Sequence, residues 1–183
     1  MIRRNVLASL LLVPAASVSA QDFLGVKPIV KAVRDGDEDK VRAALLKGEN
    51  PNQIDSTGQP LLAVAVMAGN VAVVETLLKG GAIPDSADRE GYTPLHRAAE
   101  RGDVDIVEML LRRNARTGAQ TRQGATALII AARLGFAEVV RALLDKKADP
   151  NVADFTGRRA LAYARRAGRV PIEAMLRKAG GRE

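Results

Sequence analysis

The sequence predicts an all-α solenoid of five stacked helix-turn-helix repeats with β-turn tips, and three columns of identical residues predict it. Two columns of glycine and one of alanine each recur five times at a spacing of 33 residues. The columns are Gly25, Gly58, Gly91, Gly124 and Gly157; Gly36, Gly69, Gly102, Gly135 and Gly168; and Ala32, Ala65, Ala98, Ala131 and Ala164. A fixed period of about 20 to 50 residues indicates a repeat architecture, in which each unit buries its apolar face against its neighbours.

Each repeat opens with a turn. An acidic residue stands three positions before the first glycine column at Asp22, Asp55, Asp88 and Asp154, and Thr121 takes this place in the fourth copy. In such a turn the Asp carboxylate bonds to nearby backbone N–H groups and the glycine supplies a positive φ. This phase divides one domain, residues 21–183, into repeats at 22–54, 55–87, 88–120, 121–153 and 154–183.

The first helix of each repeat follows the turn, and the third copy shows it most clearly. Thr93-Pro94 opens this helix, because proline at the first helical position loses no hydrogen bond. Leu95 and Ala98 lie at helical spacing and give a short apolar stripe. Gly102 ends the helix.

The second helix begins directly after that glycine. Asp103 is placed to cap its first turn and to interact with the positive end of the helix dipole. Ile106, Val107, Leu110 and Leu111 then lie on one helix face. Helices of about two to three turns are not stable alone, so each pair requires its neighbours.

Residues 88–99, Asp-Arg-Glu-Gly-Tyr-Thr-Pro-Leu-His-Arg-Ala-Ala, followed by Gly102 and the apolar second helix, resemble the ankyrin repeat family. The resemblance covers residues 22–183. Other copies depart from the family pattern at the start of the first helix, where they read Lys27-Pro28, Pro60-Leu61, Thr126-Ala127 and Arg159-Ala160. The glycines and the apolar second helices persist in the middle copies, so the fold prediction stands.

The outer repeats carry polar residues where inner repeats are apolar. Glu173 and Arg177 in the fifth copy replace Val and Leu of the middle copies, and Lys40 and Ala44 in the first copy replace larger apolar residues. A terminal repeat has no neighbour to bury these positions. We therefore expect both outer repeats to be caps.

Residues 1–20 have the layout of a secretory signal peptide cleaved after Ala20. Arg3 and Arg4 precede an apolar run that ends at Pro14, and small residues precede the cleavage position. The run is shorter than the roughly 20 residues that cross a bilayer, so we expect no stable membrane insertion. The alternative is a buried N-terminal helix. The first interpretation predicts a secreted protein, or a periplasmic one in a Gram-negative host.

Composition excludes several classes of site. The chain has no cysteine, which excludes disulfides, Cys-ligated zinc and thiolate nucleophiles, and His96 is its one histidine. The family resemblance implies that His96 bonds locally and ties neighbouring turns together. Asp35, Asp37 and Asp39 imitate the start of a calcium loop, but Lys40 replaces its required glycine. We predict a capped helix start there, no cofactor, no metal and no enzymatic activity.

Positive charge is confined to one end of the mature chain. Residues 22–153 hold 18 Lys and Arg against 18 Asp and Glu, whereas residues 154–183 hold eight against three, a net +5. Two interpretations remain open: a solvated cap that keeps the protein soluble, or a contact with an acidic protein or an anionic membrane surface. We expect no nucleic-acid partner, because aromatic residues are few and the compartment is wrong.

In the resembled family, partners bind the concave face formed by the turn tips and the first helices. This implies contacts from positions two, three and five of each repeat and from the two residues before the inter-helix glycine. The candidates are Met67, Arg89, Tyr92, Glu100, Arg101, Arg122, Arg133, Phe155, Arg158 and Arg166. We expect Arg101, Arg133 and Arg166 to form a ladder along this face, because Arg and Tyr are frequent interface anchors.

The predicted function is that of an exported, monomeric, non-enzymatic ankyrin module that binds an unknown protein through its concave face. The alternative is an accessory, chaperone-like, inhibitory or immunity factor for a specific extracytoplasmic enzyme or toxin. Both use the same face and differ in the partner.

Overall fold

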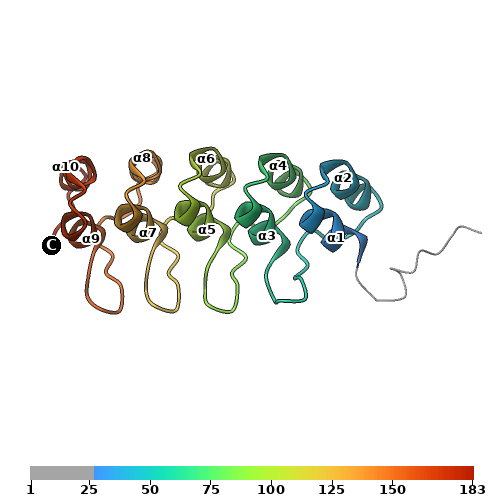
Figure 1. Ribbon diagram of the computed structural model, residues 1–183, viewed down its shortest axis with the longest axis horizontal. Coiled ribbons are helices and arrows are strands. Elements are labelled where there is room, and N and C mark those ends of the chain that lie inside the picture. Colours follow the sequence, from blue (N-terminus) through green and yellow to red (C-terminus); the bar gives the residue numbers. More distant parts are fainter. Residues whose placement is uncertain (1–26) are drawn as a thin grey trace, which may run out of the picture.

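The computed structural model describes residues 27–183, and within them ten α-helices follow one another in five antiparallel pairs (Figure 1). This confirms the predicted all-α repeat solenoid. The helices are α1 (Pro28–Asp35), α2 (Glu38–Leu46), α3 (Leu61–Ala68), α4 (Val71–Lys79), α5 (Pro94–Arg101), α6 (Val104–Arg112), α7 (Ala127–Leu134), α8 (Ala137–Asp145), α9 (Ala160–Arg166) and α10 (Val170–Lys178).

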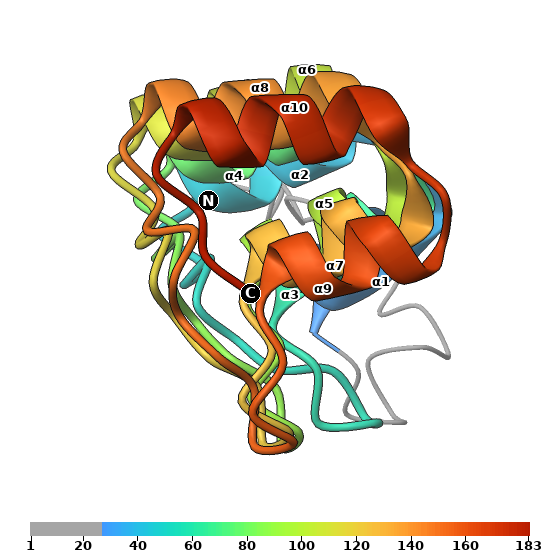
Figure 2. The same ribbon diagram turned by 90° about the vertical axis from the view of Figure 1, so that its left-hand side faces the viewer.

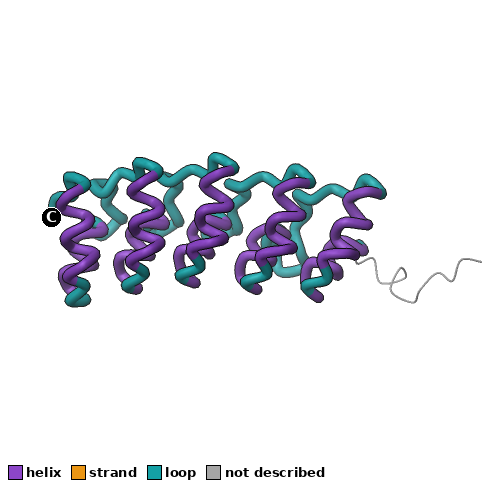
Figure 3. Tube along the Cα trace, turned by 90° about the horizontal axis from the view of Figure 1, so that it is seen from above, coloured by secondary structure: helices purple, strands orange, loops and turns teal. Residues whose placement is uncertain are grey.

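The helices form two layers. The first helices of the pairs, α1, α3, α5, α7 and α9, each contact the next in one row, and the second helices, α2 to α10, do the same in the other row. Figure 3 shows the five pairs in series along the long axis. Figure 2 shows that the connecting loops extend past the layer of first helices, away from the second helices. We call these loops the fingers and number them by the repeat they open.

The fingers and first helices form what we call the front, and the exposed side of the second helices is the back. Backbone bridges Ile54–Pro60 and Ala153–Arg159 close the base of fingers 2 and 5. The turn of the first repeat falls partly outside the described residues.

Each helix pair turns through a glycine that requires left-handed backbone. At Gly102 φ is 74°, and a side chain at this corner would overlap the ring of Phe136 from the next repeat. Only glycine adopts this conformation without strain and also leaves room for the neighbour. The glycine columns found in the sequence therefore have a steric cause.

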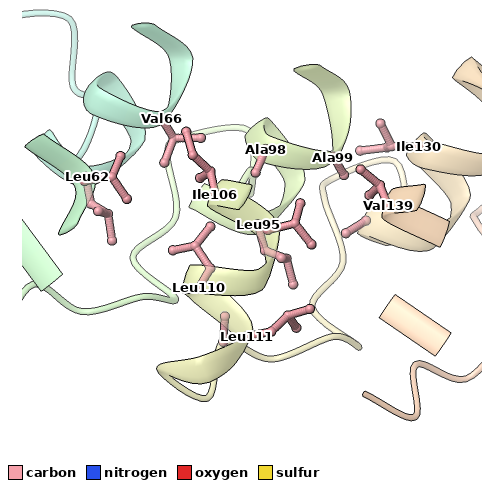
Figure 4. Close-up of a cluster of buried hydrophobic side chains, with 14 of the residues drawn as sticks. Leu62, Val66, Leu95, Ala98, Ala99, Ile106, Leu110, Leu111, Ile130 and Val139 are labelled. Atoms are coloured by element: carbon pink, nitrogen blue, oxygen red, sulfur yellow. The ribbon is translucent and has the colours of Figure 1, made fainter. Parts of the chain in front are cut away.

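The core lies between the two layers and continues through all pairs. The alanine column is 0–2% exposed, and Leu95, Ile106 and Leu110 are at most 1% exposed. Figure 4 shows side chains of α5 and α6 meeting Leu62 and Val66 from the preceding repeat. Small alanines on the first helices let bulky side chains of the second helices approach closely.

The helix starts divide the repeats into two groups. Asp37, Asn70 and Asp103 cap α2, α4 and α6, because each side chain accepts a hydrogen bond from a first-turn backbone N–H. Phe136 and Arg169 stand at the same position of α8 and α10 and form no such cap. Instead their side chains lie against Gly102 and Gly135 of the preceding repeats.

The outer repeats expose their polar substitutions. On α10, Arg177 pairs with Glu173 at 3.2 Å, and on α2, Lys40 pairs with Asp37 at 2.6 Å. Among residues 27–183, no helix has the length and apolar character needed to cross a membrane. The predicted signal peptide, residues 1–20, lies outside the described residues.

Candidate protein-binding surface

Each finger is built around a polar side chain that holds its own backbone. The Asp55 carboxylate accepts hydrogen bonds from the backbone N–H of Thr57 at 2.8 Å and of Gln59 at 3.1 Å. Asp88 and Asp154 repeat this arrangement, and Thr121 replaces it with weaker hydroxyl contacts of 3.2–3.3 Å. The turn predicted from Asp-x-x-Gly is therefore present in fingers 2, 3 and 5.

A second contact ties three fingers to the first helices. Asp88 pairs with Arg97 of α5 at 2.7 Å, and Asp154 accepts the hydroxyl of Tyr163 from α9. Asp55 is bound from the preceding repeat, by Arg34 of α1 at 3.0 Å. These contacts fix the finger bases, so side chains at the tips stand on a rigid support.

The hydrogen bonds within the fingers also lower the pKa values of the carboxylates Asp55 and Asp154. Burial alone would raise the pKa of Asp55, but bonds from Thr57, Gln59 and Arg34 outweigh it and hold that pKa far below its usual range. Burial also opposes ionisation of Asp154, and bonds from Thr156 and Tyr163 lower its pKa nonetheless. Both finger carboxylates are therefore ionised at neutral pH.

His96 bonds the third repeat to the fourth. It is 1% exposed, and its Nδ1 accepts the backbone N–H of Thr93 at 3.1 Å. Its Nε2 lies 3.0 Å from the carbonyl of Ala119 and 3.1 Å from that of Ala125. Because both partners are carbonyls, Nε2 carries the proton. Burial is the main reason that the pKa of His96 is lowered, and the predicted local, structural role is confirmed.

Tyr92 is half-buried and its ring is covered on the front. The Arg97 guanidinium lies 4.0 Å from its centroid, and the His96 ring meets it edge-on at 5.9 Å. Glu100 accepts a bond from Arg97 at 3.1 Å. The candidates Tyr92 and Glu100 therefore belong to one cluster organised by Arg97, which binds Asp88 as well.

Arg97 was not among the residues selected from the sequence. The available signal was its spacing of nine residues from Asp88, which Asp154 and Tyr163 share.

Arg101 bonds backward along the solenoid. Its Nη1 donates to the backbone carbonyl of Met67 at 2.8 Å, and its guanidinium covers Gly69. Arg133 and Arg166 stand one position earlier relative to their corner glycines, at Gly135 and Gly168. Arg101 is thus out of step with the other two, and its guanidinium is directed at the second repeat. The ladder of three remains a prediction.

Neighbouring finger tips are linked by their backbones. The N–H of Arg122 donates to the carbonyl of Glu90 at 2.9 Å, and the side chains of these residues pair at 3.6 Å. The guanidinium of Arg89 lies against Gly58 of finger 2. These candidates lie on consecutive fingers and form a continuous rim.

The remaining candidates are exposed. The Phe155 side chain is 75% exposed at the tip of finger 5, where it lies against Gly124, and Met67 is 41% exposed. The side chains of Arg133 and Arg166 form no hydrogen bond or ion pair with the described residues, and the side chain of Arg158 reaches only Thr156, at 3.5 Å. Leu134, next to Arg133, is 39% exposed and stands directly before Gly135, at one of the two positions that the family resemblance implies contact a partner.

The described residues supply no cluster of acidic or histidine side chains able to hold a metal ion. Asp37 caps α2 through the backbone N–H of Lys40 at 3.0 Å, as predicted for this acidic segment. His96 is buried, and both of its ring nitrogens are hydrogen-bonded within the described residues. The chemistry that this surface offers is contact through guanidinium and aromatic groups.

A family model described as ankyrin repeats in three copies matches residues 29–121 and again 113–181. Together these two matches span nearly all of the described chain. No curated protein matches the sequence.

Proposed function

Because the chain belongs to the ankyrin repeat family, whose members are generally non-catalytic scaffolds for protein–protein interaction, we propose that it is an exported binding protein. Its front binds a folded protein partner, and it catalyses no reaction itself. The front consists of fingers 2 to 5 with the exposed ends of α3, α5, α7 and α9.

One observation carries the choice of face: the large aromatic side chain at the tip of finger 5, Phe155, is 75% exposed. The other aromatic residues of the described chain, Tyr92, Phe136 and Tyr163, pack against the core. An exposed aromatic on a rigid tip, in line with Arg89 and Arg122, is typical of an interface anchor.

The experiment compares front and back variants of the tagged chain. Arg89, Arg122 and Phe155 are changed together to alanine, and the control changes Arg112 and Arg141 of the back to alanine. Partners are captured from the extracytoplasmic fraction and quantified by mass spectrometry. We expect the front variant to lose about tenfold or more of a partner that the control retains. Equal recovery by all three proteins would contradict the assigned face.

Export rests on the layout of residues 1–20 alone. We expect the purified protein to begin at Gln21 when it is expressed with its own N-terminus, since small residues precede the cleavage position. Intact-mass measurement tests this. A protein that keeps residues 1–20 and stays in the cytoplasm would refute export, yet leave the binding proposal intact.

A further inference from the structure

On the back of the solenoid, each second helix carries an ion pair between two of its own side chains. In each of the helices α2, α4, α6, α8 and α10, a Lys or Arg pairs with a Glu of the same helix, three or four residues away. The pairs are Arg42–Glu38, Lys79–Glu75 at 2.7 Å, Arg112–Glu108 at 3.3 Å, Arg141–Glu138 at 2.7 Å and Arg177–Glu173 at 3.2 Å. On the back, exposed arginines such as Arg112 and Arg141 thus each have an acidic partner nearby.

In the first three repeats, each front arginine named so far either pairs with an acid or contacts the backbone of another repeat. Arg34 pairs with Asp55, Arg97 with Asp88 and Glu100, and Arg122 of finger 4 reaches back to Glu90. Arg101 and Arg89 cover backbone of the second repeat. Up to finger 4, each front arginine is therefore engaged with this chain.

Three front arginines of repeats 4 and 5 have neither an acid partner nor a contact with the backbone of another repeat. Arg133 of α7, Arg158 of finger 5 and Arg166 at the end of α9 are exposed, and none has a carboxylate within ion-pair distance in residues 27–183. The acids of the last repeat are already bonded: Asp154 to Tyr163, Glu173 to Arg177, and Glu183 to Arg165. We call Arg133, Arg158 and Arg166 the uncompensated cations.

Apolar side chains accompany the uncompensated cations. Phe155 precedes Arg158 on finger 5, and Leu134, 39% exposed, follows Arg133 on α7. A surface that combines guanidinium groups with exposed apolar side chains complements a segment that carries both carboxylates and apolar residues.

We propose that the front of repeats 4 and 5 binds an acidic protein segment, whose carboxylates pair with Arg133, Arg158 and Arg166 while its apolar side chains contact Phe155 and Leu134. This deepens the proposed function and rests on it. The partner is therefore recognised at the C-terminal part of the solenoid. The first three repeats continue the packed helical layers on which this surface rests.

The shape of the front favours a protein segment over a membrane surface. Figure 2 shows the fingers extending beyond the first helices, so the front is stepped. Arg158 and Phe155 lie on the finger, whereas Arg133 and Arg166 lie on the helices behind it. A segment laid in the angle reaches both groups, whereas a flat bilayer resting on the finger tips contacts only the first.

The test uses the full chain and a defined probe, a fluorescein-labelled peptide of alternating Glu and Leu. A twin with Lys in place of Glu is the peptide control. Three proteins are compared by fluorescence anisotropy: wild type, a front variant with Arg133→Gln, Arg158→Gln and Arg166→Gln, and a back variant with Arg112→Gln, Arg141→Gln and Arg177→Gln. Both variants remove three charges from exposed side chains, so net charge is matched and circular dichroism verifies folding.

We expect the wild type and the back variant to bind the acidic peptide alike, and the front variant to bind about tenfold or more weakly. Added salt weakens the wild-type complex, because exposed charges are screened. Equal loss in both variants, or equal binding of the Lys peptide, would overturn the proposal. So would stronger binding to phosphatidylglycerol vesicles with the same dependence on the front cations, which would assign the patch to a membrane.

This outcome is separable from that of the proposed function. If the finger-tip variant at Arg89, Arg122 and Phe155 loses a captured partner while the uncompensated cations prove dispensable for that partner and for the peptide, the front remains the interface and only the acidic segment is refuted.

Discussion

The front and the back of the solenoid use arginine in different ways. On the back, Arg112 and Arg141 pair with glutamates of their own helices and remain exposed. On the front, Arg97 holds a nearly buried carboxylate and Arg101 caps a backbone carbonyl, whereas Arg133 has no partner among residues 27–183. Residue type therefore does not decide the role of an arginine here, and position in the 33-residue period does not decide it alone. Arg34 and Arg133 share that position, yet only Arg34 pairs with an acid of the next repeat, Asp55.

The difference has a physical basis. A pair within one exposed helix contributes little, because water screens it and both side chains lose rotamer freedom. A pair that spans a finger and a helix is shielded from water and fixes two segments at once. Front polar contacts should therefore dominate stability, and variants can test this from the largest expected effect to the smallest.

The largest effect is expected at the base of the front, at His96. Its replacement by alanine leaves the Ala119 carbonyl and the Thr93 N–H without their partner and removes one of the two donors to the Ala125 carbonyl, which also accepts the N–H of Thr121. We expect His96→Ala to lower the free energy of unfolding by about 3 kcal/mol, measured by urea denaturation. A loss below about 0.5 kcal/mol would mean that water replaces these bonds without penalty.

His96 also predicts the pH dependence. Since its pKa is lowered in the folded protein, the unfolded chain binds a proton at a pH where the folded chain does not. Stability should thus be greatest above the unfolded value of about 6.5 and decrease as the pH falls below it. The lowered pKa values of Asp55 and Asp154 add a further loss below about pH 4. His96→Ala should remove the first decrease and keep the second; a wild-type profile flat between neutral and mildly acidic pH would contradict this assignment.

Next in size is a matched pair of arginines. Arg97→Met removes the partner of Asp88, whose side chain is only 8% exposed, and removes the stacking on Tyr92. We expect a loss of about 2 kcal/mol in unfolding free energy. Arg112→Met on the back should change it by about 0.5 kcal/mol or less. Equal effects of the two substitutions would remove the energetic distinction between front and back.

A smaller change in the free energy of unfolding, this time a gain, is expected at the residue with positive φ that follows each second helix. After each second helix one residue adopts a positive φ: glycine in three repeats, Asn114 at 60° and Lys147 at 59° in the others. Lys147→Gly should stabilise the protein by about 1 kcal/mol, because the left-handed conformation strains a side chain. Asn114→Gly serves as the control and should gain less, since asparagine tolerates this conformation. Thermal denaturation measures both, and destabilisation by the glycine at 147 would refute the strain.

The smallest effect is expected on the back itself. Glu138→Gln removes the partner of Arg141 in α8, and we expect a change of about 0.3 kcal/mol that disappears in high salt. Denaturation at two salt concentrations tests this. A salt-independent loss as large as that of Arg97→Met would show that the back pairs are structural.

Much of the fold could be predicted from the sequence because its causes repeat. The corner glycines need positive φ, and the alanine column admits the bulky side chains opposite, so each copy shows the same constraint. Some side-chain contacts between repeats are not shared by all copies. Arg101 turns back to Met67, and Phe136 replaces a helix cap with packing on Gly102. Both depend on the residue that one copy carries at a position where the other copies differ.

The candidate surface was predictable to a lesser degree. The position of Phe155 on a tip follows from the period, but the engagement of Tyr92 and Glu100 by Arg97 requires the distances. Leu134 was open to prediction, because it stands directly before Gly135, and the structure leaves it 39% exposed.

The side chains that cross to the preceding corner bear on how such a chain can change its length. Unequal recombination between copies would remove 33 residues at a time and keep every corner glycine in phase. Loss of residues 121–153 would bring Arg169 over Gly102, where a guanidinium finds the same kind of carbonyl acceptor that it now has in Leu134. The two repeats that become adjacent would therefore form an equivalent contact, whereas the deletion would remove Arg133 and Leu134 from the front. Loss of a whole repeat would therefore preserve the packing between repeats but change the residues that the front offers to a partner.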